Sequence, residues 1–108
     1  MIFQNWGSGT GDSDTSLFSP FHSKEHPPKG ANYTFYTNTK VDELVTRARE
    51  VDDAQRDALY REAVALIMDD APWTMLNQLV HLEVRHKGVE NVGHHAGFLM
   101  YFGAATKK

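Results

Sequence analysis

Residues 38–73 read NTKVDELVTRAREVDDAQRDALYREAVALIMDDAPW. The first part of this stretch predicts an amphipathic helix that begins at Asn38 or Thr39. Either side chain can accept hydrogen bonds from the free N–H groups of a first helical turn. Apolar residues then recur at the three- and four-residue spacing that places them on one helix face. We expect this face to be buried, and its members are Val41, Leu44, Val45, Ala48 and Val51.

The second part predicts another helix, which Asp52 and Asp53 cap. It ends by Asp70, because the residue before Pro72 disfavours the helical region of backbone space. The tryptophan after the proline, Trp73, is expected in the core. The buried face of this second helix is predicted to consist of Leu59, Tyr60, Ala63, Leu66 and Ile67.

The N-terminal third predicts a short strand followed by loops. Residues 2–6 are apolar and aromatic, which is typical of a strand. Residues 7–16 contain no large apolar side chain and three glycines, and we expect a loop there. Residues 22–34 are polar, include two adjacent prolines, and are expected to form a surface loop. Between the two loops, four residues are expected to pack against the core: Leu17, Phe18, Pro20 and Phe21.

The C-terminal third predicts two strands and a tail. Residues 80–85 alternate strictly between apolar and polar, which predicts a half-buried strand with Val80, Leu82 and Val84 inward. His86 to Gly88 is expected to be a turn, residues 98–102 a buried strand, and residues 103–108 a loose tail. The fold class is therefore α+β, with two helices packed on a small mixed sheet.

Composition limits the possible functions. The 108 residues are 41% hydrophobic and 23% charged with a formal net charge of −3, as in an ordinary globular domain. No basic stripe is present, so nucleic-acid binding is not expected. There is no cysteine, which excludes disulfides and thiolate chemistry. Residues 1–6 do not form a signal peptide, which taken alone predicts a cytoplasmic protein but carries no weight if the chain is a piece of a longer one.

Several short elements, in this order, resemble a known family. They are Trp6 with the Gly/Ser/Asp segment after it; Leu17, Pro20 and Phe21; Asn32, Phe35 and Tyr36; Asn38, Val41, Asp42 and Leu44; Asp53, Arg56, Leu59, Tyr60 and Ala63; Asp70 to Trp73; and Lys87 to Val89. Together they are similar to the C-terminal part of the extracytoplasmic solute-binding proteins of dipeptide, oligopeptide, glutathione and nickel ABC importers. The N-terminal elements are most similar to the glutathione-binding branch.

The resemblance implies a fold, a location and partners. Residues 1–108 would be a single partial domain, the C-terminal lobe segment of a two-lobed fold of the type II periplasmic-binding-protein kind. The full-length protein would be periplasmic or attached to the cell surface. It would capture a small peptide or peptide-like solute and deliver it to a membrane ABC permease. The resemblance implies no enzymatic activity. We expect no cofactor and assign no metal-binding residue, although the family includes nickel carriers.

The resemblance also implies where the solute binds. The segment after Trp6 would face the cleft between the lobes, which gives six candidate ligand-binding residues: Trp6, Ser8, Gly9, Thr10, Asp12 and Asp14. Dipeptide-binding members carry, three residues after this tryptophan, an aspartate that binds the ligand's ammonium group. Gly9 stands there in this chain. Because an ammonium in a cleft needs a charged partner, a modified peptide or another polar solute is favoured over a simple dipeptide.

Other interpretations of the same residues remain open. Residues 7–11 lack the Lys-Ser/Thr of a phosphate loop, and Asp12 with Asp14 fit turn or capping roles better than catalysis. Trp6 fits a core position about as well as a cleft position. Two further functions are a small structural domain that self-associates through exposed apolar surface, and a nickel or zinc site of His94 and His95 with His81 or His86.

Overall fold

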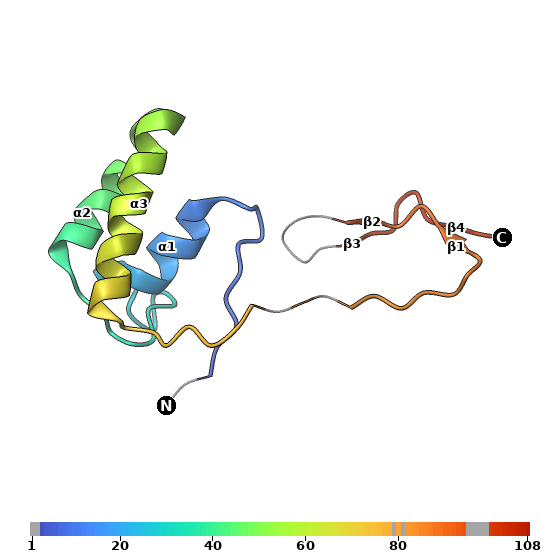
Figure 1. Cartoon of the computed structure of the whole chain (residues 1–108), viewed down its shortest axis with the longest axis horizontal. Coiled ribbons are helices and arrows are strands. Elements are labelled where there is room, and N and C mark those ends of the chain that lie inside the picture. The colour runs from blue at the N-terminus through green and yellow to red at the C-terminus, as the bar shows by residue number, and fades with distance from the viewer. Residues whose placement is uncertain (1–2, 79, 81, 95–99) are drawn as a thin grey trace.

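The computed structural model describes residues 3–78, 80, 82–94 and 100–108. Its α-helices are α1 (Ser13–Phe21), α2 (Thr39–Arg47) and α3 (Asp53–Asp70), with a 3-10 turn η1 (Ser23–Glu25) after α1. Four two-residue strands follow: β1 (Val89–Glu90), β2 (Gly93–His94), β3 (Met100–Tyr101) and β4 (Thr106–Lys107). Figure 1 shows the helices gathered at one end of the molecule and the strands at the other. We call residues 3–73 the helical body and residues 74–108 the arm.

Helix α3 forms where the sequence predicts it, whereas α2 begins as predicted but ends at Arg47, before the predicted face residue Val51. Asn38 caps α2, and its Oδ1 accepts hydrogen bonds from the N–H groups of Lys40 and Val41 at 3.0 and 3.3 Å. Asp52 caps α3 and accepts from the N–H of Gln55 at 3.0 Å. Helix α3 ends at Asp70 as expected, and the next residue adopts left-handed backbone angles.

The three helices enclose one core, which confirms the apolar faces predicted for α2 and α3 except at Val51, which lies beyond α2 and is only partly buried. Full burial of a valine, leucine, isoleucine or phenylalanine side chain stabilises a fold by about 1.5–3 kcal/mol. Trp73, predicted to be a core residue, packs at the edge of this core with its ring 4.8 Å from that of Phe21. The buried apolar residues are Leu17, Phe21, Val41, Leu44, Val45, Ala48, Tyr60, Ala63 and Ile67.

Helix α1 corrects the predicted loop over residues 7–16, because residues 13–16 are helical. Asp12 is the cap, and its Oδ1 accepts a hydrogen bond from the N–H of Asp14 at 2.7 Å. The first turn of α1 carries only small and polar side chains, so no apolar periodicity marks its start. Leu17 and Phe21 pack into the core as predicted.

The predicted surface loop over residues 22–34 is wrong at two positions, since His22 and Asn32 are buried. The Nδ2 of Asn32 donates to the backbone oxygens of His22 and Tyr36 at 3.1 and 2.8 Å. Its Oδ1 accepts from the N–H of Tyr36 at 3.1 Å. Asn32 therefore satisfies backbone groups that a buried loop would otherwise leave unpaired. The strand predicted over residues 2–6 is also wrong, as the described residues 3–6 form none.

The arm is a long antiparallel hairpin with an interruption. Strand β1 pairs with β4, and β2 pairs with β3. Between the two ladders, residues 91–92 lie opposite residues 102–105, which form a turn closed by the N–H of Ala105 on the oxygen of Phe102 at 3.0 Å. The predicted loose tail is thus wrong for β4. The turn predicted at His86–Gly88 is confirmed, since the N–H of Val89 donates to the oxygen of His86 at 2.9 Å.

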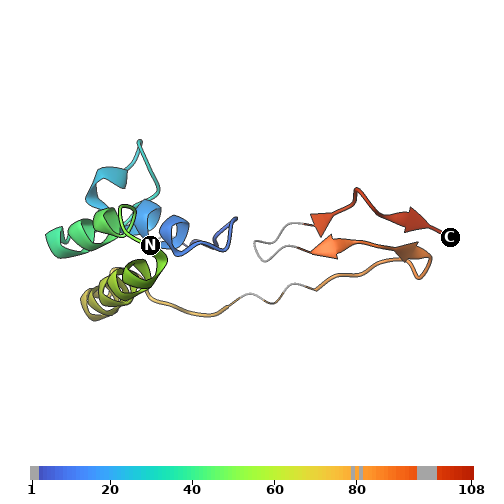
Figure 2. The ribbon, with the colours of Figure 1, turned by 90° about the horizontal axis from the view of Figure 1, so that it is seen from above.

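The half-buried strand predicted over residues 80–85 is wrong for its described members, which belong to no ladder. Val80, Leu82 and Val84 are 81%, 91% and 97% exposed. A contact of 2.9 Å between Glu83 Oε2 and His94 Nε2 places this segment beside β2 (Figure 2). In the predicted strand over residues 98–102, Met100 and Tyr101 form β3 but are exposed rather than buried, and residues 98–99 lie outside the described residues.

The fold class is α+β, as predicted, but the predicted packing of two helices on a mixed sheet is wrong. The helices pack on one another, both ladders are antiparallel, and no described residue of the arm is buried. The radius of gyration is 17.6 Å, against about 13 Å for a compact domain of 100 residues. Among the described residues, no helix is long and apolar enough to cross a membrane.

Candidate functional site

The predicted ligand-binding segment lies on the surface of the helical body, ahead of and within the first turn of α1. Trp6 is half-buried, and its Nε1 donates to the backbone oxygen of Thr15 at 3.3 Å, which ties the indole to α1. The same ring borders an open hollow of about 430 Å³ that we call the aromatic hollow. It is lined by Phe3, Gln4, Asn5, Trp6 and Tyr33.

The middle of the segment is a tight turn with its hydroxyl groups close together. Ser8 Oγ and Thr10 Oγ1 lie 3.3 Å apart, and Thr10 Oγ1 also accepts from the N–H of Asp12 at 3.3 Å. Gly11 has a φ of +79°, a conformation that glycine adopts at no steric cost. Gly9 and Thr10 are exposed, and Ser8 is half-buried. These residues form the outward side of the segment.

The two aspartates of the segment are held by arginines of the neighbouring helices. Asp12 Oδ1 accepts from Arg56 at 2.6 Å, and Arg56 lies on α3. Asp14 forms a two-pronged pair with Arg49, with its oxygens 2.6 and 2.8 Å from Nε and Nη2. Tyr60 donates its hydroxyl to Asp14 at 3.3 Å and accepts from Arg56 Nε at 3.4 Å. We call these five residues the aspartate–arginine cluster.

The cluster fixes the charge of its members. Hydrogen bonds from the backbone N–H of Asp14 and from Arg56 lower the pKa of Asp12. The bond from Arg49 lowers the pKa of Asp14. Burial raises the pKa of the Tyr60 hydroxyl. Both carboxylates are therefore ionised and balanced by adjacent cations at neutral pH, as expected when an acid lies beside a guanidinium.

Arg49, Arg56 and Tyr60 are not among the site residues predicted from the sequence. Arg56 and Tyr60 are spaced by four residues, which places both on one face of α3. That spacing is a usable signal for a shared contact. No comparable signal marks Arg49, which follows the end of α2 and reaches Asp14 only through the tertiary fold.

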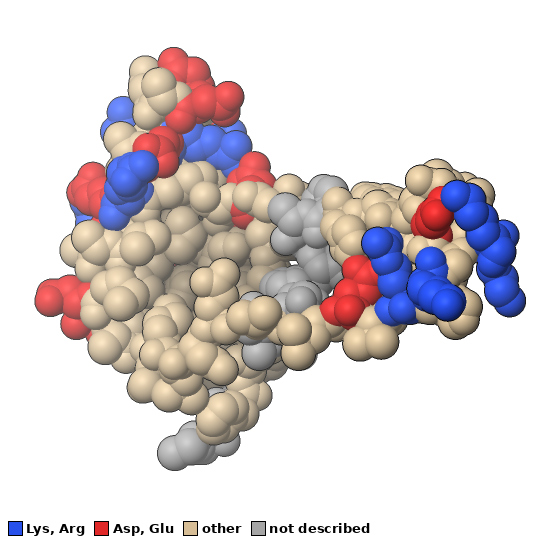
Figure 3. Space-filling view, turned by 45° about the vertical axis from the view of Figure 1, so that its right-hand side comes forward, with Lys and Arg blue, Asp and Glu red and all other residues tan. Residues whose placement is uncertain are grey.

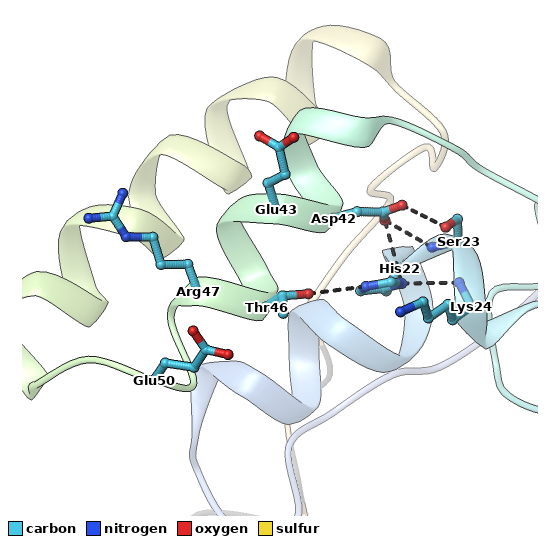
Figure 4. Close-up of a pocket in the computed structure, with 8 residues that line it drawn as sticks. All are labelled: His22, Ser23, Lys24, Asp42, Glu43, Thr46, Arg47 and Glu50. Carbon is cyan, nitrogen blue, oxygen red and sulfur yellow. Dashed lines mark hydrogen bonds and ion pairs between the residues drawn. The ribbon is translucent and has the colours of Figure 1, made fainter.

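A second hollow, of about 540 Å³, lies where η1 meets α2 (Figure 4). His22 is buried at its base. Its Nδ1 accepts from the N–H of Lys24 at 3.0 Å, so its Nε2 carries the proton that faces Thr46 Oγ1 at 3.2 Å. Asp42 accepts from the N–H and hydroxyl of Ser23 at 2.9 and 2.6 Å. These polar groups bond to one another across the junction of α1, η1 and α2, so they connect elements of the fold.

The histidines proposed for a metal site are only partly described. His94 pairs with Glu83, and His86 Nδ1 accepts from the N–H of Gly88 at 3.1 Å. His81 and His95 lie outside the described residues. Within the described part of the chain, no three metal-ligating side chains converge.

Comparison with known proteins identifies relatives of the chain. No family model matches it. Glutathione-binding protein GsiB of Shigella dysenteriae serotype 1 and GsiB of Escherichia coli strain K12 are each 34% identical to it over 77 residues. That match covers 70% of this chain and 15% of each relative, so the chain spans only a small part of their length. The predicted resemblance is confirmed: over most of its length the chain is similar to a C-terminal segment of the glutathione-binding members of the solute-binding protein family of peptide and nickel ABC importers.

Proposed function

We propose that this chain is a segment of a larger solute-binding protein, which captures a small peptide-like solute outside the cytoplasmic membrane for an ABC importer. The similarity to glutathione-binding proteins over 70% of the chain carries this proposal. The full-length protein would have two lobes of the type II periplasmic-binding-protein kind. Solute would favour their closed arrangement through its higher affinity for that state. Its role is binding and delivery, not catalysis.

The arm supports the proposal that more polypeptide surrounds this segment. Its apolar side chains alternate as in a half-buried strand, yet three of them are at least 81% exposed. Burying them stabilises a protein by about 25 cal/mol per Å² of apolar surface, and the helical body does not cover them. The missing cover would be supplied by the remainder of the larger protein.

The ligand-facing part of the segment would be Trp6, Ser8, Gly9 and Thr10, with Asp12 and Asp14 behind them. The aromatic hollow offers an indole and a phenol at one edge, and the turn offers two hydroxyl groups. This is one wall of a cleft. Glutathione, a modified peptide with several hydrogen-bonding groups, fits such a wall better than a dipeptide held mainly by its ammonium group, because both aspartates already have cationic partners.

Calorimetric titration of glutathione and of a simple dipeptide tests the proposal. The titration is made against the 108-residue chain and against the longer natural protein that contains it. We expect the longer protein to bind glutathione at one site and Trp6→Ala to weaken that binding. The 108-residue chain is expected to bind weakly or not at all. Tight one-to-one binding by the 108-residue chain alone would contradict the proposal, as would a longer protein that binds neither solute.

A self-associating structural domain is the second candidate, and the exposed apolar arm favours it. Figure 3 shows basic side chains gathered at the outer end of the arm. Residues 74–108 contain four basic and two acidic residues, whereas residues 1–73 contain seven basic and twelve acidic ones. The arm of one copy is thus complementary in charge to the helical body of another. Sedimentation of the 108-residue chain and of the longer protein tests this candidate. If the 108-residue chain sediments as a dimer and the longer protein does not, the self-association belongs to the isolated segment.

A further inference from the structure

We propose that Arg49 and Arg56 are positioning residues of the ligand-facing segment, and that Asp12 and Asp14 hold this segment against the helices instead of contacting the solute. This inference rests on the proposed function, and it divides the six predicted ligand-binding residues into two groups. Trp6, Ser8, Gly9 and Thr10 form the outward group. The two aspartates form the inward group.

The cluster joins three elements that are far apart in the sequence. Asp12 and Asp14 belong to the cap and first turn of α1, Arg49 follows the end of α2, and Arg56 lies in the first turn of α3. The pairs bridge 35 and 44 residues of chain. The start of α1 is therefore fixed at two points, one on each of the other helices.

The geometry of these pairs differs from that of an ordinary surface ion pair. Exposed pairs contribute about 0–1 kcal/mol, because solvent screens them and both side chains lose freedom. Arg49 instead meets Asp14 with two parallel hydrogen bonds, which adds orientation as well as energy. Its guanidinium lies 3.3 Å from the centre of the Phe18 ring, which restricts its rotation. Tyr60, buried in the core, adds a third contact to Asp14.

The segment has few other attachments. None of residues 6–14 is buried, and Trp6 is joined to α1 by the hydrogen bond from its Nε1 to the oxygen of Thr15. A segment with little buried apolar surface opens at a lower free energy than the core does. Loss of either arginine should therefore loosen residues 7–14 while α2 and α3 keep their packing.

Nitrogen-15 relaxation of the 108-residue chain measures this directly. The variants are Arg49→Gln and Arg56→Gln, and the matched control is Arg61→Gln. Arg61 also lies on α3 and pairs with Asp57 at 2.7 Å, but it does so on the exposed face away from the segment. Backbone order parameters are compared between residues 7–14 and residues 41–67.

We expect the order parameters of residues 7–14 to fall from about 0.8 to below about 0.6 in both test variants. Those of residues 41–67 should stay unchanged, and Arg61→Gln should change neither set. Arg49→Lys should restore order only in part, because an ammonium cannot form the two-pronged pair. Unchanged order at residues 7–14, or an equal loss in α2 and α3, would overturn the inference.

Glutathione binding by the longer natural protein separates this inference from the proposed function. If the function and the inference both hold, Arg49→Gln and Arg56→Gln raise the dissociation constant at least tenfold, while the control Arg61→Gln leaves it unchanged. If the protein binds glutathione and these variants bind it as tightly as the parent does, the positioning role is refuted. If the parent protein binds neither glutathione nor the simple dipeptide but the variants still loosen residues 7–14, the proposed function fails and the structural role of the cluster remains.

Discussion

Asn32 offers the sharpest test of how the loop between α1 and α2 is held. Its side chain is 0% exposed and bonds three backbone groups, the oxygens of His22 and Tyr36 and the N–H of Tyr36. The substitution Asn32→Asp keeps the shape of the side chain and replaces its NH₂ donor with an oxygen. Both backbone oxygens then lose their donor from this residue, and the new carboxylate oxygen faces them at about the same distances.

The expected loss of stability follows from these contacts. Leaving a buried polar group unpaired costs about 1–3 kcal/mol. The backbone oxygen of Tyr36 keeps a second neighbour, His26 Nε2 at 3.0 Å. The free-energy cost of removing the Asn32 donor from this oxygen therefore lies at the lower end of that range. The remaining loss of stability comes from the unpaired backbone oxygen of His22 and from the burial of the new carboxylate. We therefore expect Asn32→Asp to lower the free energy of unfolding by about 2–4 kcal/mol at pH 7.

Urea unfolding followed by circular dichroism at 222 nm gives this free energy. The control is Asn77→Asp, the same chemical change at an exposed position in the arm, which should stay within about 0.5 kcal/mol of the parent. Burial raises the pKa of a carboxyl group, so Asn32→Asp should recover part of its lost stability as the pH falls from 7 to 4. A loss below about 0.5 kcal/mol at pH 7, or a loss that does not depend on pH, would refute the reasoning.

The remaining predictions concern pH and the arm. The pKa of Asp14 is lowered, so the ionised Asp14 side chain contributes to stability above about pH 4, and this contribution disappears as the pH falls below 4. The urea midpoint of Asp14→Asn should therefore vary less than that of the parent between pH 5 and 3. Burial lowers the pKa of His22, so the contribution of neutral His22 to stability is fully present above about pH 6.5 and declines as the pH falls further. His22→Gln should therefore remove this part of the pH dependence of the unfolding free energy between pH 7 and 5. Changing Val80, Leu82 and Val84 together to serine should reduce sedimenting oligomers and leave the unfolding free energy within about 0.5 kcal/mol, because these side chains are exposed.

The sequence predicted those elements whose signals are local. Capping by Asn38 and Asp52, the apolar faces of α2 and α3 and the end of α3 before Pro72 all depend on residues within a few positions of each other. The start of α1 was missed because its first turn has no apolar side chain and its cap, Asp12, also fits a turn. The ladder of β1 and β4 was missed because it pairs residues 16 and 18 positions apart in short polar strands.

The strand predicted over residues 80–85 failed for a different reason. Its alternation is real, but alternation predicts a strand only where a neighbouring strand and an apolar layer are available. The described chain supplies neither for Leu82 and Val84. In the candidate site, resemblance selected the segment from Trp6 to Asp14, but only the structure brings Arg49 and Arg56 to its aspartates. Long-range ion pairs of this kind leave no periodic pattern in one sequence.

The most direct test of the central claim, that this chain is a segment of a larger solute-binding protein, is the size and location of its natural gene product. An antibody raised against the 108-residue chain is used to probe fractionated source cells by immunoblot. We predict a band several times larger than 12.2 kDa in the periplasmic or membrane fraction. A band near 12.2 kDa in the cytosol would contradict the claim.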